Sequence, residues 1–167
     1  MRALAEDVGL TAMALYRHYP DKDAIILALT TDALEVWGKR VEAIEANAPL
    51  AWLDKQAEAF LDFALETPRR FEAAFLLPAP VRRLPDVIDE GRSPPLKKAV
   101  DVIRQGQRDG TFCDVPAFDI FMTFWGLTQG LITLYRAERF SGGEVAFRKI
   151  YRAAARRCQR SFLKDNS

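Results

Sequence analysis

The chain has 167 residues, 49% of them hydrophobic, and a formal net charge of +1. These values exclude a disordered or strongly charged protein, and the length allows one or two small domains with a buried core. We find no apolar run that approaches the roughly 20 uncharged residues needed to cross a bilayer, and residues 1–9 mix charges with apolar positions, unlike a signal peptide. Cys113 and Cys158 lack a CxxC pattern and predict neither a disulfide framework nor a metal site. We expect a cytoplasmic protein with no membrane segment.

The first predicted elements are two short helices joined by a tight turn. Ala5, Gly9 and Leu15 have the spacing of a helix-turn-helix. A small residue lets the helices cross closely, glycine takes a left-handed turn at low cost, and leucine fills the seam. Thr11 is a suitable N-cap for the second helix, and Pro20 ends that helix. This geometry is typical of a unit that reads DNA.

The outward face of the second helix carries the side chains that can reach DNA. At about 100° per residue, Leu15 and Tyr19 face the protein, whereas Met13 and Arg17 point away from it. An arginine there can bind guanine or a phosphate. Lys22 opens the next helix, where its charge and the free amides can hold a phosphate. Acidic and basic residues balance in residues 1–22, so net charge does not support DNA binding. The prediction of a DNA-reading unit therefore depends on the helix-turn-helix spacing alone.

Every later long segment has helical periodicity, and no segment shows sustained strand alternation. Asp21 and Thr67 are plausible N-caps, and the prolines between residues 78 and 85 predict an irregular connection. The sequence therefore predicts an all-α fold. The predicted helices after the helix-turn-helix cover about residues 21–44, 50–66, 68–75, 94–109, 117–135 and 143–163.

The last two helices differ from the others. The segment 117–137 is apolar nearly all round, so we expect it to be buried on more than one side, and Gly126 and Gly130 allow another helix to approach closely. The segment 143–163 is amphipathic. Together they suit a four-helix interface in a homodimer, through helices of about 117–137 and 143–163. The basic residues of the last helix indicate a solvated face, or alternatively a second surface for nucleic acid or an acidic partner.

Aromatic residues gather on the middle helices of the predicted bundle. Such stripes are more often plain core than a binding site, yet this set is large for a small domain, and Thr123, Thr128 and Gln129 can orient a ligand. We expect a small apolar or aromatic effector that is not chemically changed. The candidate ligand-binding residues are Phe60, Phe63, Phe75, Phe121, Phe124, Trp125 and Gln129.

Nothing in the sequence points to catalysis. His18 is the only histidine, it belongs to the helix predicted to read DNA, and the carboxylates are spread along exposed faces rather than paired. We therefore predict no enzyme, no catalytic residue, no metal and no cofactor.

The run Leu15-Tyr16-Arg17-His18-Tyr19-Pro20-Asp21-Lys22, with Ala5 and Gly9 before it, resembles the N-terminal domain of TetR-family transcriptional regulators. The resemblance implies a dimeric repressor that binds palindromic operator half-sites and carries an all-helical ligand-binding domain. Family members have a full first helix before the segment equivalent to Met1-Arg2, so we expect this domain to be incomplete and to hold DNA weakly. The DNA-contact positions that the resemblance implies are Thr11, Ala12, Met13, Tyr16, Arg17, His18 and Lys22.

These observations predict a DNA-binding domain with its connecting helix in residues 1–46, and a ligand-binding and dimerisation domain in residues 47–167. The run from Trp125 to Leu131 is similar to the signature of the TetR subfamily named for a Trp-His-Gly motif, with Gln129 in place of the histidine. We predict a TetR-like transcriptional regulator, a repressor relieved by a small ligand. The alternative is a helical ligand-binding or interaction dimer that has lost DNA binding.

Overall fold

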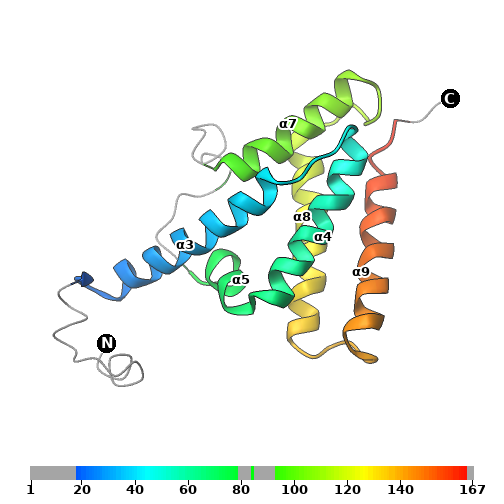
Figure 1. Ribbon diagram of the computed structural model, residues 1–167. Coiled ribbons are helices and arrows are strands. Elements are labelled where there is room, and N and C mark those ends of the chain that lie inside the picture. Colours follow the sequence, from blue (N-terminus) through cyan, green and yellow to red (C-terminus); the bar gives the residue numbers. More distant parts are fainter. Residues whose placement is uncertain (1–17, 79–83, 85–92, 165–167) are drawn as a thin grey trace.

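The computed structural model describes residues 18–78, 84 and 93–164 (Figure 1). This part of the chain contains six α-helices and, apart from an isolated bridge between Phe112 and Leu163, no β-structure, so the predicted all-α fold is confirmed. The helices are α3 (Lys22–Glu42), α4 (Pro49–Glu66), α5 (Pro68–Phe75), α7 (Pro94–Arg108), α8 (Ala117–Arg136) and α9 (Gly143–Arg160).

The ends of the helices follow local signals in the sequence. The Asp21 carboxylate accepts a hydrogen bond from the Ala24 amide at 2.8 Å, which confirms the predicted cap of α3. Thr67 occupies the N-cap position of α5 as expected, but its side chain does not cap that helix. Its hydroxyl instead donates to the Phe63 carbonyl oxygen at 2.8 Å, which satisfies the last turn of α4. Pro68 starts α5, where a missing amide hydrogen costs nothing.

Helix α4 is the centre of the bundle, because it packs against α3, α5, α7, α8 and α9. Phe60, Leu61 and Phe63 of α4 are all buried in one continuous hydrophobic core. The buried Tyr151 of α9 donates its hydroxyl hydrogen bond to the Ala57 carbonyl oxygen at 2.9 Å. The longest described helix, α3, begins away from the bundle and ends beside α7 and α4 (Figure 1).

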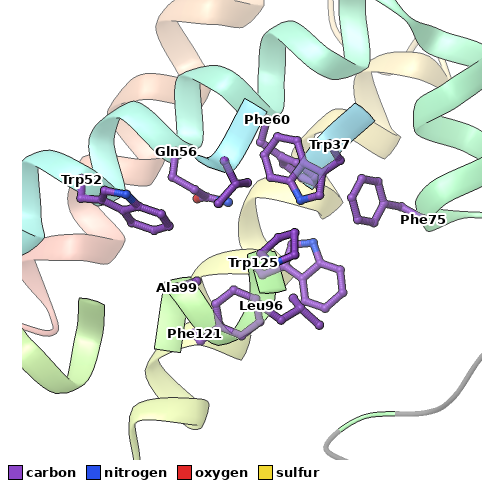
Figure 2. Close-up of a pocket in the computed structure, with 11 residues that line it drawn as sticks. Trp37, Trp52, Gln56, Phe60, Phe75, Leu96, Ala99, Phe121 and Trp125 are labelled. Carbon is purple, nitrogen blue, oxygen red and sulfur yellow. The ribbon is translucent and has the colours of Figure 1, made fainter. Parts of the chain in front are cut away.

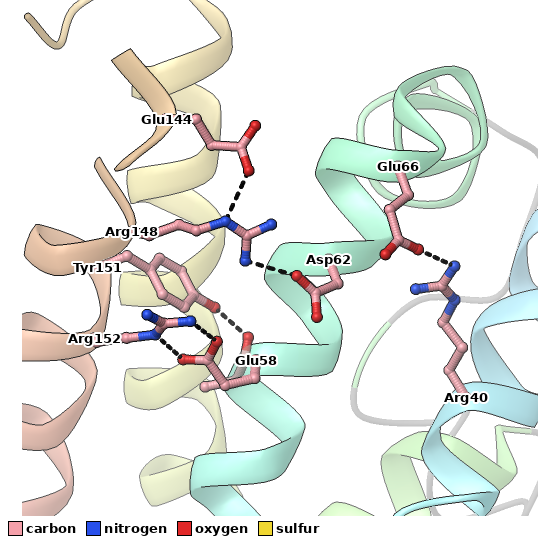
Figure 3. Close-up of polar contacts among 9 residues, drawn as sticks. Arg40, Glu58, Asp62, Glu66, Glu144, Arg148, Tyr151 and Arg152 are labelled. Atoms are coloured by element: carbon pink, nitrogen blue, oxygen red, sulfur yellow. Dashed lines mark hydrogen bonds and ion pairs between the residues drawn. The ribbon is translucent and has the colours of Figure 1, made fainter. Parts of the chain in front are cut away.

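Two arginines of α9 form ion pairs that join this helix to α4 (Figure 3). Arg148 donates to Asp62 at 2.7 Å and to Glu144 on its own helix at 2.8 Å. Arg152 binds both carboxylate oxygens of Glu58, at 2.7 and 2.8 Å. This part of the basic stripe therefore holds the bundle together and is not simply a solvated face.

Within the described part of one chain α8 is buried on one side only, so the burial on more than one side that the sequence predicts depends on a second copy and stays a prediction. Leu134 remains 47% exposed, and a Cβ added at Gly126 or Gly130 would meet no atom within 4 Å. Of the helices described, α8 is long and apolar enough to cross a membrane by length and composition alone, a test that the core helix of a helical bundle also passes. The face that it buries against the bundle carries Ile120, Phe121, Phe124, Thr128 and Ile132.

Candidate functional site

The structure reaches only the end of the predicted DNA-reading unit. His18 and Lys22 are both exposed, and Lys22 is the first residue of α3. A lysine at the first turn of a helix is placed to contact a phosphate beside the free amides. The other predicted DNA contacts lie outside the described residues and stay predictions: Thr11, Ala12, Met13, Tyr16 and Arg17.

A cluster of aromatic rings joins α3 to the middle of the bundle. The ring of Trp37, on α3, lies 5.2 Å from Phe60, 5.6 Å from Phe63 and 6.1 Å from Phe75, measured between ring centroids. Trp125 of α8 meets Phe75 edge-on at 6.1 Å. Such edge-to-face and tilted contacts stabilise aromatic clusters. The rings from α3, α4, α5 and α8 thus meet in one place.

A small cavity of about 20 Å³ lies within this cluster (Figure 2). Four of the seven predicted ligand-binding residues line it, namely Phe60, Phe75, Phe121 and Trp125. The other three, Phe63, Phe124 and Gln129, do not line it. The lining residues that sequence reasoning missed are Trp37, Val41, Trp52, Gln56, Pro95, Leu96 and Ala99.

Some of the missed residues carried a signal that was available in the sequence. Trp52 and Gln56 precede Phe60 at intervals of four residues, which places all three on one face of α4. Trp37 belongs to the apolar stripe of α3, but the stripe alone does not show that it reaches the same cavity as α4. That fact depends on how the two helices pack.

The polar residues expected to orient a ligand act elsewhere. The Thr123 hydroxyl donates to the Asp119 carbonyl oxygen at 2.8 Å, and the Thr128 hydroxyl donates to the Phe124 carbonyl oxygen at 3.0 Å, both within α8. The Gln129 amide makes a long contact of 3.5 Å with the Phe75 carbonyl oxygen of α5. The residues that do line the cavity with a polar group are Gln56, with its amide, and Trp37, Trp52 and Trp125, with their indole N–H groups.

The volume of the cavity shows whether the site can hold a ligand in this structure. A cavity of about 20 Å³ holds about one water molecule, whereas pockets for small organic ligands measure about 300–1,000 Å³. The site is therefore closed in this structure. A ligand of ordinary size enters it only if part of the wall moves.

Helix α3 is tied directly to the helices that surround the cavity. The buried Thr30 hydroxyl donates to the Ala73 carbonyl oxygen of α5 at 3.1 Å. Arg70 of α5 pairs with Asp32 of α3 at 3.2 Å. Arg40 of α3 pairs with Glu66 of α4 at 2.8 Å (Figure 3). These contacts tie the middle of α3 to α5 and its end to α4, so a displacement of α5 acts directly on α3.

The fold and the cavity define an all-helical protein in which one long helix leads from the predicted DNA-reading end into an aromatic core. Residues 53–158, more than half of the chain, match the family of tetracyclin repressor-like C-terminal domains. The chain therefore belongs to the TetR family of transcription regulators, as the N-terminal motif predicted. The narrower placement in the Trp-His-Gly subfamily stays a prediction.

Solved structures share this fold at low sequence identity. A TetR family transcription regulator from Marinobacter aquaeolei is 18% identical, with a TM-score of 0.70 over 96% of this chain and 83% of its own. The TetR family transcriptional regulator PfmR from Thermus thermophilus is 21% identical, with a TM-score of 0.68 over 95% and 86%. A protein of unknown function from a Rhodococcus species is 20% identical, with a TM-score of 0.73 over 98% and 84%. No curated protein matches the sequence.

Proposed function

We propose that this chain is a dimeric, cytoplasmic repressor whose operator binding is relieved when a small apolar or aromatic ligand enters the closed cavity. One observation carries the proposal. Trp37 of α3 forms part of the wall of that cavity, and the same helix begins directly after the predicted recognition helix. Helix α3 thus links the cavity to the predicted DNA-reading unit.

The small volume of the cavity couples ligand binding to a movement of α3. A ligand needs several times the present volume of about 20 Å³, so it must displace a wall formed by Trp37 of α3, Phe75 of α5 and Leu96 of α7. Any of these displacements changes how α3 sits on the bundle, because α5 and α7 both pack against α3. The ligand shifts the equilibrium only by the difference between its affinities for the closed and open states.

In a dimer, a movement of α3 changes DNA binding because two recognition helices must fit the operator at once. Two copies joined through the exposed faces of α8 and α9 present two recognition helices, at half-sites about 34–36 Å apart or a multiple of that spacing. The open space above Gly126 and Gly130 supports this interface, because glycines let two helices approach closely. A change in the angle of α3 then alters the separation of the two readers.

A band-shift assay tests the proposal. The DNA is the region upstream of the protein's own gene, the protein is this chain and an N-terminally extended form, and the added compounds are aromatic and lipophilic. We expect retarded DNA that is released by those compounds that bind the core. A compound that binds the core without changing operator affinity refutes the coupling. If the N-terminally extended chain retards no DNA in this assay, the proposed DNA-binding regulator is refuted and an interaction dimer is favoured.

Substitutions separate coupling from binding. Trp37→Leu removes the ring that α3 contributes to the cavity, whereas Trp125→Leu removes a comparable ring from α8. We expect both variants to bind ligand more weakly than the wild type. At saturating ligand, only Trp37→Leu should show a reduced release of DNA, because of the two rings only that of Trp37 belongs to α3.

A further inference from the structure

We propose that the effector of this protein is an uncharged aromatic compound with a hydrogen-bond acceptor at one end, and that the indole N–H of Trp52 binds this acceptor. The inference rests on the proposed function, because it names the chemical class of ligand that the same cavity selects. It depends on a buried polar group that the described residues leave without a partner.

The Trp52 side chain is 3% exposed and lines the cavity. Its Nε1 atom is fully buried, and no acceptor from the residues described lies within hydrogen-bond distance of it. Buried N–H groups are rarely left unpaired, since each costs about 1–3 kcal/mol. Among the described residues the Gln159 Nε2 atom is also buried without a partner, but Gln159 does not line the cavity, and the buried Tyr151 hydroxyl is satisfied by the Ala57 carbonyl oxygen. The unpaired indole therefore marks a position for an acceptor that is not part of the chain.

Helix α4 lines the cavity with Trp52 and Gln56 near its start and with Phe60 further along. Trp52, Gln56 and Phe60 follow one another along the same face of the helix, and all three line the cavity (Figure 2). Trp52 and Gln56 therefore lie toward the start of α4, whereas Phe75 packs on Phe60 at the other end and meets Trp125 in turn. A ligand that lies along α4 places its polar end at Trp52 and its ring among the aromatic side chains.

The described wall of the cavity carries no charged side chain, so it favours an uncharged ligand. None of the described residues that line the cavity is an acid or a base. An ion transferred into such an environment without a partner loses its hydration and gains nothing in return. The site thus favours a neutral acceptor, such as a ketone, ester or ether oxygen, over a carboxylate or an amine.

Three rigid compounds of nearly equal shape test this inference. They are 9-fluorenone, which carries a neutral carbonyl oxygen, fluorene, which carries none, and fluorene-9-carboxylate, which is charged. Equilibrium dialysis against the whole chain gives the dissociation constant of each. We expect the ketone to bind about tenfold more tightly than the hydrocarbon, the value of one net hydrogen bond, and the carboxylate to bind more weakly than either.

Two variants separate the N–H from the ring. Trp52→Phe keeps an aromatic side chain and removes the donor, and Trp125→Phe makes the same change at another lining residue. We expect Trp52→Phe to abolish the preference for the ketone over fluorene, and Trp125→Phe to preserve it. Because each comparison is a ratio within one variant, a general loss of packing cancels.

Each outcome supports or overturns the inference. Equal binding of ketone and hydrocarbon by the wild type means that a water molecule alone serves the indole, and this overturns it. So does a ketone preference that survives Trp52→Phe, or tightest binding of the carboxylate. If fluorene binds as tightly as the ketone and its binding releases operator DNA from the protein, this inference is overturned and the proposed function still holds. Failure of all three compounds to bind overturns both.

Discussion

The exposed face of α8 predicts how a single substitution should separate folding from dimerisation. Gly130 lies in the middle of this face, and a Cβ added there meets no atom of the described chain within 4 Å. Gly130→Leu therefore causes no clash within one copy. It replaces a poor helix former by a good one, so the folded chain should gain about 0.7 kcal/mol.

The same substitution should weaken the proposed dimer strongly. In a two-fold interface each copy contributes the new side chain, so the interface is overpacked at two places. Overpacking costs about 1–3 kcal/mol at each place, or about 2–6 kcal/mol in all, which is at least a ~30-fold weaker dimer. Sedimentation equilibrium measures the dimer constant, and circular dichroism at low protein concentration measures the stability of the single chain.

A leucine on another face provides the control. Lys98 is exposed on α7, so Lys98→Leu adds the same side chain away from α8 and should leave the dimer constant unchanged. If Gly130→Leu dimerises as tightly as the wild type, α8 does not form the interface through this face. If the wild-type chain is monomeric at every concentration, the dimer itself is refuted.

Three further results are expected. Lys22→Ala removes an exposed charge at the start of α3 and should weaken operator binding in a band-shift assay while leaving dimerisation intact; unchanged affinity would exclude the phosphate contact. Gly106→Ala places a Cβ 2.3 Å from a ring carbon of Phe112, which is 1% exposed, so overpacking should outweigh the gain in helix propensity and lower the free energy of unfolding by about 1–2 kcal/mol; a higher unfolding midpoint would contradict this. Burial, with the charge of Glu58, raises the pKa of Tyr151 above its ordinary value. The folded chain therefore keeps a proton that the unfolded chain loses above about pH 10, and stability should fall there by up to about 1.4 kcal/mol per pH unit. Urea unfolding from pH 9 to 11 should show a smaller slope for Tyr151→Phe, and an identical slope would refute the assignment.

The helices and their limits followed from the sequence because the signals are local. The carboxylate of Asp21 caps α3, and prolines stand at the first turns of α4, α5 and α7. These groups act within one turn of the helix, so they can be recognised without knowledge of the rest of the chain. The exception was the Thr67 hydroxyl, which two adjacent helices could both use, and only the structure shows that α4 takes it.

The candidate site was predictable only in part. Aromatic periodicity identified Phe60, Phe75, Phe121 and Trp125, because apolar stripes show which face of each helix is buried. The same pattern included Phe63 and Phe124, which are buried in the core but do not line the cavity. Periodicity does not distinguish a residue that fills the core from one that borders a cavity.

The sequence by itself determined the family, the helical class and the buried face of the amphipathic helices, since all three depend on residue type and spacing. Tertiary structure alone decided that Trp37 of α3 meets α4 at a closed cavity. It also decided that, among the described residues, Trp52 keeps an unpaired donor there and one face of α8 remains uncovered. The physical reason is that a helical stripe specifies an apolar surface but not the surface that covers it. That choice depends on packing between segments far apart in the chain.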